Sequence, residues 1–308
     1  MRRAESAPSL SPCQTLALGL LQGPTELLPV SSSAHTALIS WLAGWSYTEL
    51  DPELRKSLEV ALHAGAGAAL AIDMRGELIE AAHTLDRRRI AVIALSLAPP
   101  VIAGYALERP IERRLGGPCS IVSGLIAGAV AMALADLRPE WHLPPGWHGG
   151  TGRKADRGRA GNALGGESRT RGMRRYEEAG PRDGLALGLA QAAALIPGVS
   201  RNGATLTVAR AAGFARADAV ALSWHGGLPV IFGASTLKAW RLRRRVSRGA
   251  WPALAVGAGG AFVSTLASAR VLRRPRVNAG PLLPYAVYRC MIAAIAIMRM
   301  RSTQNRGG

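Results

Sequence analysis

The sequence contains few cysteines and few aromatic residues. Its three cysteines, Cys13, Cys119 and Cys290, are scattered and lack the close spacing of a metal or redox site, so we interpret them as small packing residues. Phe, Trp and Tyr together make up only 5% of the chain. Nucleic-acid-binding surfaces combine basic side chains with aromatic ones on a folded domain. This composition therefore argues against nucleic acid as a partner.

Charged residues are absent from long stretches of the chain. Only 19% of the residues are charged, whereas 48% are hydrophobic. The main uncharged windows are 6–25, 90–107, 115–135, 219–237 and 249–269. Several of them approach the roughly 20 residues that an α-helix needs to cross about 30 Å of hydrocarbon. A soluble helical protein would instead show amphipathic stripes. We therefore predict an all-α, polytopic integral membrane protein in contact with membrane lipids.

Lysine is nearly absent, although the formal net charge is +18. Lysine occurs only at Lys56, Lys154 and Lys238, and arginine supplies the other positive charges in clusters between the apolar windows. Basic loops of this kind are typical of segments that flank membrane spans and meet anionic headgroups. The loops on both sides of the window 249–269 are basic, so charge alone leaves the orientation open.

A heptapeptide occurs twice. Residues 16–22 read LALGLLQ and residues 185–191 read LALGLAQ, and a Leu-Pro or Ile-Pro step followed by a polar cluster comes after each copy. A repeat of this kind in an apolar chain predicts two halves that are built alike and face each other, as inverted-topology repeats do. We therefore divide the chain into a first half (1–137), a polar loop rich in Arg and Gly (138–182) and a second half (183–308).

Glu26 is the carboxylate of the first polar cluster. It is the only acidic residue between positions 6 and 48, and a charged residue at membrane depth costs about 2.5–3.5 kcal/mol on insertion scales. Gln22 lies four residues earlier, on the same helical face. A carboxylate and an amide oxygen suit a hard divalent cation, so both residues are candidate metal ligands. A structural role for Glu26 at a helix cap stays open.

Arg201 is the guanidinium of the second cluster. An arginine within an apolar stretch is costly unless it meets an anion, and its donor fork matches two phosphate oxygens. An ion pair with Glu26 is the competing interpretation. Pro29 and Pro197 predict that the helices break there, in turns that line a wet cavity. The polar and small residues of these turns are candidate substrate-binding residues, namely Ser31, Ser33, Ser200, Asn202 and Gly203, together with Gln22.

Two motifs resemble those of a known family. The run from Gln22 to His35, QGPTELLPVSSSAH, resembles the first signature of the undecaprenyl-diphosphate phosphatase family, also called the bacitracin-resistance family. The run 197–205, PGVSRNGAT, resembles the second signature, in which Asn202 replaces the usual Ser. The resemblance covers almost the whole chain except 138–182, and it includes His63 on the family's next helix.

The resemblance implies two re-entrant helix hairpins and the hydrolysis of undecaprenyl diphosphate to undecaprenyl phosphate and inorganic phosphate. This reaction would recycle the lipid carrier for cell-wall synthesis and confer bacitracin resistance, in a bacterial inner (plasma) membrane with the active site facing outward. The resemblance also implies Mg²⁺ or Ca²⁺ as cofactor. Ser32 aligns with the family's proposed nucleophile, although water stays open for that role. The expected catalytic residues are Glu26, Ser32, His35 as general base or acid, and Arg201.

Several alternatives stay open. A secondary transporter or a lipid-carrier flippase would share inverted repeats and broken helices. A type-2 phosphatidic acid phosphatase is excluded, because its motif requires a histidine where this chain has Thr207. We expect His63 and His225 to be packing or cavity-lining residues and Arg289 to snorkel to the headgroup level, and a supporting role of Arg289 at the site stays open. Self-association into a homo-oligomer is possible.

Overall fold

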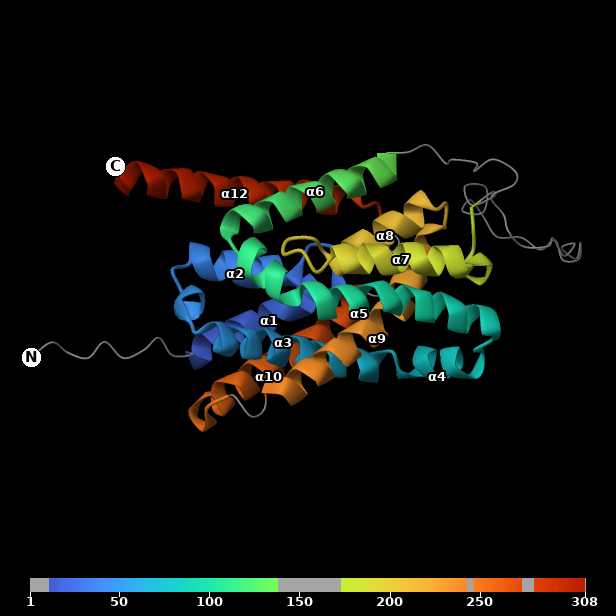
Figure 1. Ribbon diagram of the computed structural model, residues 1–308, viewed down its shortest axis with the longest axis horizontal. Coiled ribbons are helices and arrows are strands. Elements are labelled where there is room, and N and C mark those ends of the chain that lie inside the picture. The colour runs from blue at the N-terminus through green and yellow to red at the C-terminus, as the bar shows by residue number, and fades with distance from the viewer. Residues whose placement is uncertain (1–10, 138–172, 243–245, 273–279, 308) are drawn as a thin grey trace, which may run out of the picture.

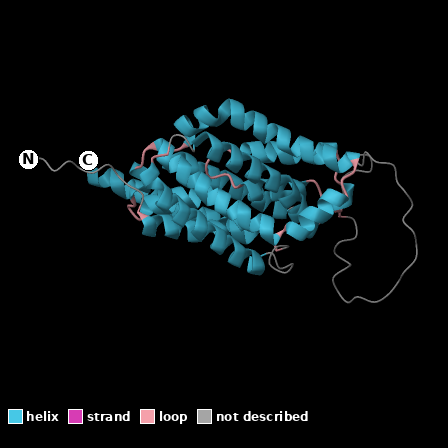
Figure 2. Cartoon of the chain, turned by 90° about the horizontal axis from the view of Figure 1, so that it is seen from below, coloured by secondary structure: helices cyan, strands magenta, loops and turns pink. Residues whose placement is uncertain are grey.

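The computed structural model describes residues 11–137, 173–242, 246–272 and 280–307 (Figure 1). Helices make up nearly all of these residues, and short turns connect them (Figure 2). The α-helices are α1 (Pro12–Leu27), α2 (Ser32–Leu42), α3 (Pro52–Asp73), α4 (Arg75–His83), α5 (Arg87–Leu115), α6 (Pro118–Leu137), α7 (Pro181–Ala193), α8 (Arg201–Ala211), α9 (Arg216–Leu242), α10 (Trp251–Leu272) and α12 (Leu283–Gly307). Short 3-10 turns are η1 (Ser46–Glu49), η3 (Tyr176–Glu178) and η4 (Arg248–Ala250). The predicted all-α class is confirmed.

Four helical segments in the described part of the chain are long and apolar enough to cross a membrane. They are Arg87–Leu107, Pro118–Asp136, Arg248–Leu272 and Leu283–Thr303. Large apolar side chains point outward from them, as in α5, where Val101 and Ile102 are more than 60% exposed. Such surfaces are stable in lipid, whose hydrocarbon replaces the protein neighbours of a buried side chain. The chain is an integral membrane protein.

The repeated heptapeptide places a glycine at a close helix contact in each half. α1 packs along α10, and α7 packs along α5. A Cβ atom on Gly19 of α1 would collide with the main-chain oxygen of Gly257, and one on Gly188 of α7 would collide with that of Leu95. Gly19 and Gly188 hold the same place in the two copies. The repeat therefore encodes backbone-to-backbone packing, the role that small residues often have in membrane helices.

Both predicted helix breaks are present. α1 ends at Leu27, and Ser31 has a positive φ of 76° before α2 begins. Such a backbone costs of order 1–3 kcal/mol in a non-glycine residue, and strain of this kind clusters at functional sites. In the second half Gly198 has φ 92°, a value that glycine adopts readily, and α8 begins at Arg201. We call these two segments, 28–31 and 194–200, the first and second motif turns.

Two apolar clusters join the helices around the motif turns, and α10 and α12, which belong to one cluster each, lie at opposite edges of the bundle (Figure 1). One joins α1, α3 and α10 and includes Leu18, Leu58 and Leu62, each about 1% exposed. The other joins α2, α6 and α12 and includes Leu38 and Leu125. The motif turns are therefore held between helices that are packed on both sides.

Two further sequence predictions concern the cysteines and the polar loop 138–182. Cys13, Cys119 and Cys290 were interpreted as small packing residues, but all three are exposed and do not pack in the protein interior. These three positions lie on the outer surface of the bundle. Most of the predicted polar loop 138–182 lies outside the described residues. Its end is held to the second half by Arg174, whose guanidinium binds the Asp183 carboxylate at 2.6 Å.

Candidate active site

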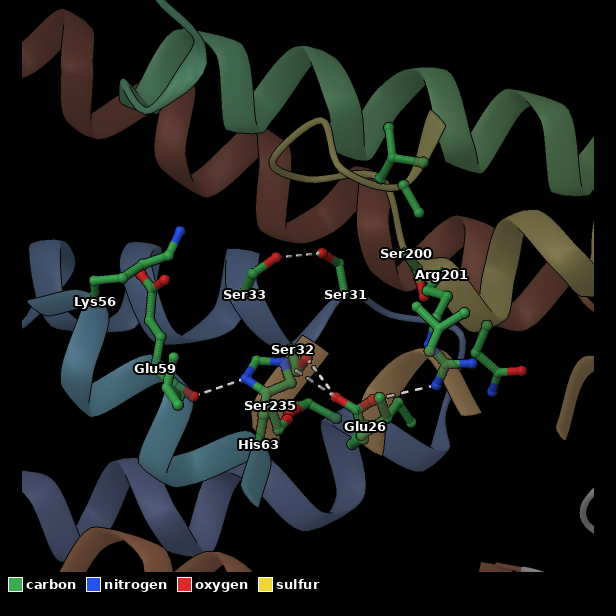
Figure 3. Close-up of a pocket in the computed structure, with 17 residues that line it drawn as sticks. Glu26, Ser31, Ser32, Ser33, Lys56, Glu59, His63, Ser200, Arg201 and Ser235 are labelled. Atoms are coloured by element: carbon green, nitrogen blue, oxygen red, sulfur yellow. Dashed lines mark hydrogen bonds and ion pairs between the residues drawn. The ribbon is translucent and has the colours of Figure 1, made fainter. Parts of the chain in front are cut away.

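A pocket of about 220 Å³ opens where the two motif turns meet α3 and α9 (Figure 3). Its apolar wall includes Val60, Val199 and Ile231. Its polar wall is formed by Thr25, Glu26, Ser31, Ser32, Ser33, Lys56, Glu59, His63, Ser200, Arg201, Asn202 and Ser235. Residues from both halves of the chain therefore face one space. Hydroxyl, guanidinium, ammonium and imidazole groups dominate it, and these groups suit a phosphate ligand.

Glu26 is at the centre of the polar wall. Its side chain is 7% exposed, and donors approach both carboxylate oxygens. Oε1 accepts from Nη2 of Arg201 at 3.2 Å, and Oε2 accepts from Oγ of Ser32 at 2.8 Å and from Nε2 of Gln22 at 3.2 Å. Nε2 of His63 lies 3.7 Å from Oε2. These donors compensate the burial of the charge and join α1, α2, α3 and α8 at one carboxylate.

Arg201 retains unused hydrogen-bonding capacity. Nη2 contacts Glu26, but Nη1 is buried without a partner among the described residues. Gly227 of α9 makes room for this nitrogen, because a Cβ atom there would collide with it. The Trp224 ring lies 5.9 Å from the guanidinium carbon. A buried donor without a partner is costly, so an anion in the pocket would supply the missing acceptor.

The serines of the first motif contact Glu26 or one another at the pocket, whereas Ser200 of the second motif caps a helix. Ser32 points at Glu26, and Oγ of Ser31 lies 3.4 Å from Oγ of Ser33 on the pocket wall. In the second motif, Oγ of Ser200 accepts from the backbone N–H of Gly203 at 3.1 Å and caps α8. This cap fixes the first turn of α8, from which Arg201 projects.

Asn202 connects the two motifs. Its Nδ2 donates to the carbonyl oxygen of Leu27 at 2.7 Å, and its Oδ1 accepts from Oγ of Ser223 at 2.9 Å. Leu27 ends α1, directly after Glu26. Asn202 lines the pocket, and its side chain is already engaged in holding the end of α1 against α8 and α9.

The structure does not bring His35 and Gln22 to the pocket wall. His35 is 1% exposed, its Nδ1 donates to the Ser31 carbonyl oxygen at 2.7 Å, and its Nε2 lies 2.8 Å from the Tyr288 hydroxyl. The two rings are also stacked, with centroids 5.6 Å apart. Gln22 is equally buried and contacts Glu26 from within α1. Both residues therefore contact pocket residues, His35 contacting Ser31 and Gln22 contacting Glu26, without lining the pocket themselves.

α3 contributes more polar side chains to the pocket than expected from the sequence. His63, predicted to be a packing or cavity-lining residue, does line the pocket, and it also contacts Glu26. Its Nδ1 donates to the Glu59 carbonyl oxygen at 2.8 Å, so its Nε2 faces the pocket. Lys56, Glu59 and His63 follow a helical spacing of three and four residues, which places them on one face. That spacing was visible in the sequence and could have indicated a polar face.

Glu59 is itself held in place. The Tyr47 hydroxyl donates to its Oε1 at 2.8 Å. Burial, together with the nearby Glu59 carboxylate, raises the pKa of Tyr47 well above the ordinary value, so its hydroxyl stays protonated and continues to donate.

The predicted snorkelling of Arg289 is wrong. This residue is 1% exposed, and its guanidinium donates to four main-chain carbonyl oxygens inside the bundle. The reason is that Arg289 lies on the face of α12 that packs against α6 and the motif turns. Tyr288, the preceding residue, is 40% exposed.

The pocket contains oxygen ligands that a divalent cation could use. Within the described ranges, no three or more His, Cys, Asp or Glu side chains gather closely enough to hold a metal by themselves. Glu26 and Glu59 both line the pocket, however. Mg²⁺ is commonly bound by one or two carboxylates together with the phosphates of a substrate. The residues present therefore fit a cation that shares its coordination with a bound phosphate.

These features define a helical membrane protein with a phosphate-compatible pocket between two related motifs. The chain belongs to the family described as bacitracin resistance protein BacA, whose sequence profile matches residues 15–295. It is 33% identical over 298 residues to an undecaprenyl-diphosphatase of Geobacter metallireducens, covering 92% of this chain and 97% of that protein. It is 32% identical over 301 residues to an undecaprenyl-diphosphatase of Alcanivorax borkumensis, with the same two coverages.

Proposed function

We propose that this protein hydrolyses undecaprenyl diphosphate to undecaprenyl phosphate and inorganic phosphate. The observation that carries the proposal is the convergence of Ser32 and Arg201, from different motifs, on the Glu26 carboxylate inside one pocket. Membership of the family and the names of the relatives support the same substrate. The product would re-enter cell-wall synthesis as lipid carrier, and its recycling would confer bacitracin resistance.

Ser32 is the nucleophile in this proposal. Its hydroxyl donates to Glu26 at 2.8 Å, which orients the oxygen and gives its proton an acceptor. The Ser32 oxygen would bond to the terminal phosphorus, and the bond from that phosphorus to the bridging oxygen would break, releasing undecaprenyl phosphate. Water would then cleave the phosphoserine and release inorganic phosphate. Attack by water in place of Ser32 is the alternative, and a trapped phosphoserine would exclude it.

Arg201 would stabilise the charge on the transferred phosphoryl group. Its unpartnered Nη1 provides a donor for a phosphate oxygen while Nη2 contacts Glu26. His63 adds a hydrogen-bonding nitrogen from α3. We assign direct contact with the phosphate to His63. His35 acts through its hydrogen bonds to Ser31 and Tyr288.

A divalent cation, Mg²⁺ or Ca²⁺, would be held by Glu26 and Glu59 together with the diphosphate. When bound, it would neutralise part of the negative charge of the substrate. Gln22 was expected to be a second ligand, and its hydrogen bond to Glu26 supports an orienting role in its place. Omission of divalent cations from a phosphate-release assay, followed by their restoration, tests this part of the proposal.

We also propose that the two halves are inverted-topology repeats, each with a re-entrant helix hairpin around its motif turn. The equivalent glycine contacts and the two helix breaks support this arrangement. The proposed location is a bacterial inner membrane with the pocket facing outward, where the used lipid carrier would be processed.

A transporter or flippase is not favoured, because the curated relatives carry the name of a diphosphatase. The deciding experiment measures phosphate release by the purified full-length protein from undecaprenyl diphosphate. We expect release that depends on Glu26. Transport of the lipid without phosphate release would reject the proposed function.

A further inference from the structure

Arg289 forms an unusual buried contact between the two motif turns and α6. Its side chain is among the largest that are fully buried. Nε donates to the carbonyl oxygen of Leu125 at 3.2 Å, and Nη2 donates to that of Gly124 at 3.1 Å. Nη1 donates to Pro29 at 3.3 Å, and Nη2 also donates to Gly198 at 2.8 Å. Among the described residues, none of its hydrogen-bond partners is a carboxylate.

The two turn residues that Arg289 contacts are equivalent positions of the repeat. Gly198 follows Pro29 by 169 residues, the same interval that separates Leu16 from Leu185 in the repeated heptapeptide. One guanidinium therefore binds the same carbonyl in both motifs. The planar fork of arginine can donate in several fixed directions at once, which the single ammonium group of lysine cannot do.

Each clamped carbonyl lies three residues before a side chain of the pocket. Pro29 precedes Ser32, and Gly198 precedes Arg201. A shift of either turn would therefore change the distance between the hydroxyl and the guanidinium that meet at Glu26. Phosphoryl transfer depends strongly on such alignment, and a misplacement of about 1 Å can cost about 10²-fold in rate.

We propose that Arg289 is a positioning residue that clamps the two motif turns together and thereby sets the spacing between Ser32 and Arg201. This inference rests on the proposed function for its kinetic consequence. Its structural part stands independently of any activity.

The surroundings of Arg289 fit this role. α6 has a glycine, Gly128, opposite the guanidinium, and a Cβ atom there would collide with Nη2. The neighbouring residue on α12, Tyr288, binds His35 at the start of α2. Two consecutive residues of α12 therefore hold the first motif, and one of them also holds the second.

The test uses the full-length protein in detergent and three variants. Arg289→Lys keeps the charge but removes the fork. Gly128→Ala leaves Arg289 intact and displaces its guanidinium. Arg210→Lys is the matched control, because Arg210 also donates to a main-chain carbonyl oxygen, that of Phe214, but away from both motif turns. For each variant, the kcat and KM of phosphate release from undecaprenyl diphosphate and the thermal unfolding temperature are measured.

A second measurement does not depend on activity. Spin labels are attached to cysteines introduced at Ser33, beside the first motif turn, and at Ile196, within the second. Both positions are exposed, and the three native cysteines are replaced. The dipolar coupling between the labels reports the spacing of the turns. In Arg289→Lys and Gly128→Ala we expect a broadened distance distribution and a kcat about 10²-fold lower, with a smaller change in KM. Arg210→Lys should match the wild type in both.

Unchanged label distances and unchanged kcat in folded Arg289→Lys and Gly128→Ala would overturn the proposal. So would a changed distance with an intact kcat, because the clamp would then have no effect on the chemistry. Failure of both variants to fold would also overturn it, since Arg289 would then support the whole bundle. If the wild type releases no phosphate, the proposed function fails, and the label distances alone decide whether Arg289 clamps the turns.

Discussion

Ser32 and Arg201 contact the same carboxylate from opposite motifs. Ser32 Oγ lies 2.8 Å from Oε2 of Glu26, and Arg201 Nη2 lies 3.2 Å from Oε1. The two residues are separated by 169 positions, so they are also equivalent in the repeat. One copy of the motif contributes a hydroxyl and the other a guanidinium. Predictions about the site therefore concern both halves of the chain.

Replacement of Glu26 by Gln should lower phosphate release by about 10²-fold or more, because Ser32 loses its charged acceptor and the cation loses a ligand. The protein should still insert and fold, since glutamine has nearly the same shape. Phosphate release and thermal unfolding of the purified variant check this. The exposed Glu77→Gln, on α4, is the matched control and should behave as wild type. Near-normal turnover of Glu26→Gln would remove Glu26 from the site.

Arg201→Lys separates transition-state stabilisation from simple charge balance. Lysine keeps the charge but cannot contact Glu26 and a phosphate oxygen with a planar fork. We expect kcat to fall by about 10³-fold, the lower end for arginine groups in phosphoryl transfer, with a smaller change in KM. Steady-state kinetics measure both constants. A raised KM with an intact kcat would make Arg201 a binding residue only.

His63→Leu should lower phosphate release by about tenfold or more, the effect of losing one hydrogen bond of about 1.4 kcal/mol to a charged partner. His225→Leu is the matched control. His225 has the same backbone contact, from Nδ1 to the Ala221 carbonyl oxygen at 2.7 Å, but its ring packs on Tyr176 beside a different pocket. Equal activity of the two variants would exclude a direct contact between His63 and the phosphate.

His35→Leu should mainly reduce stability. The substitution removes the two ring hydrogen bonds, to the Ser31 carbonyl oxygen and to the Tyr288 hydroxyl, and each contributes about 0.5–1.5 kcal/mol to stability. The Ser31 carbonyl oxygen keeps its bond from the backbone N–H of residue 35. Thermal unfolding in detergent should therefore occur at a lower temperature. A variant with wild-type stability and no activity would show that His35 acts in the chemistry itself.

Asn202→Ala should also destabilise the protein, because the Leu27 carbonyl and the Ser223 hydroxyl lose hydrogen bonds. We expect a loss of about 1–3 kcal/mol. Asn202→Ser restores the residue that is usual in the family, but its shorter side chain cannot span from Leu27 to Ser223. Partial recovery of the unfolding temperature in Asn202→Ser is expected. An unfolding temperature of Asn202→Ala equal to that of the wild type would show that these hydrogen bonds contribute little to stability.

The sequence predicted much of the site because polar residues are rare in its apolar windows. Glu26 and Arg201 were conspicuous for that reason, and the repeat placed them in facing motifs. The role of His35 could not be predicted, because the positive φ of Ser31 decides which way α2 leaves the turn. The buried position of Arg289 could not be predicted for a related reason. Its contacts with Pro29 join residues 260 positions apart, and no local pattern records such a contact.

The glycine contacts limit how the bundle can move. Where Gly19 meets Gly257, main chain lies against main chain. Where Gly188 meets Leu95, the close side-chain atoms belong to the ring of Pro99, which cannot change rotamer freely. Such surfaces resist sliding, since shear motions of packed helices depend on small side-chain adjustments. α1 with α10, and α7 with α5, should therefore travel as rigid pairs. Any opening that admits a long lipid into the pocket must occur between the pairs. One such place is where Gly67 of α3 leaves room for a Cβ atom beside Ile231 and Phe232 of α9.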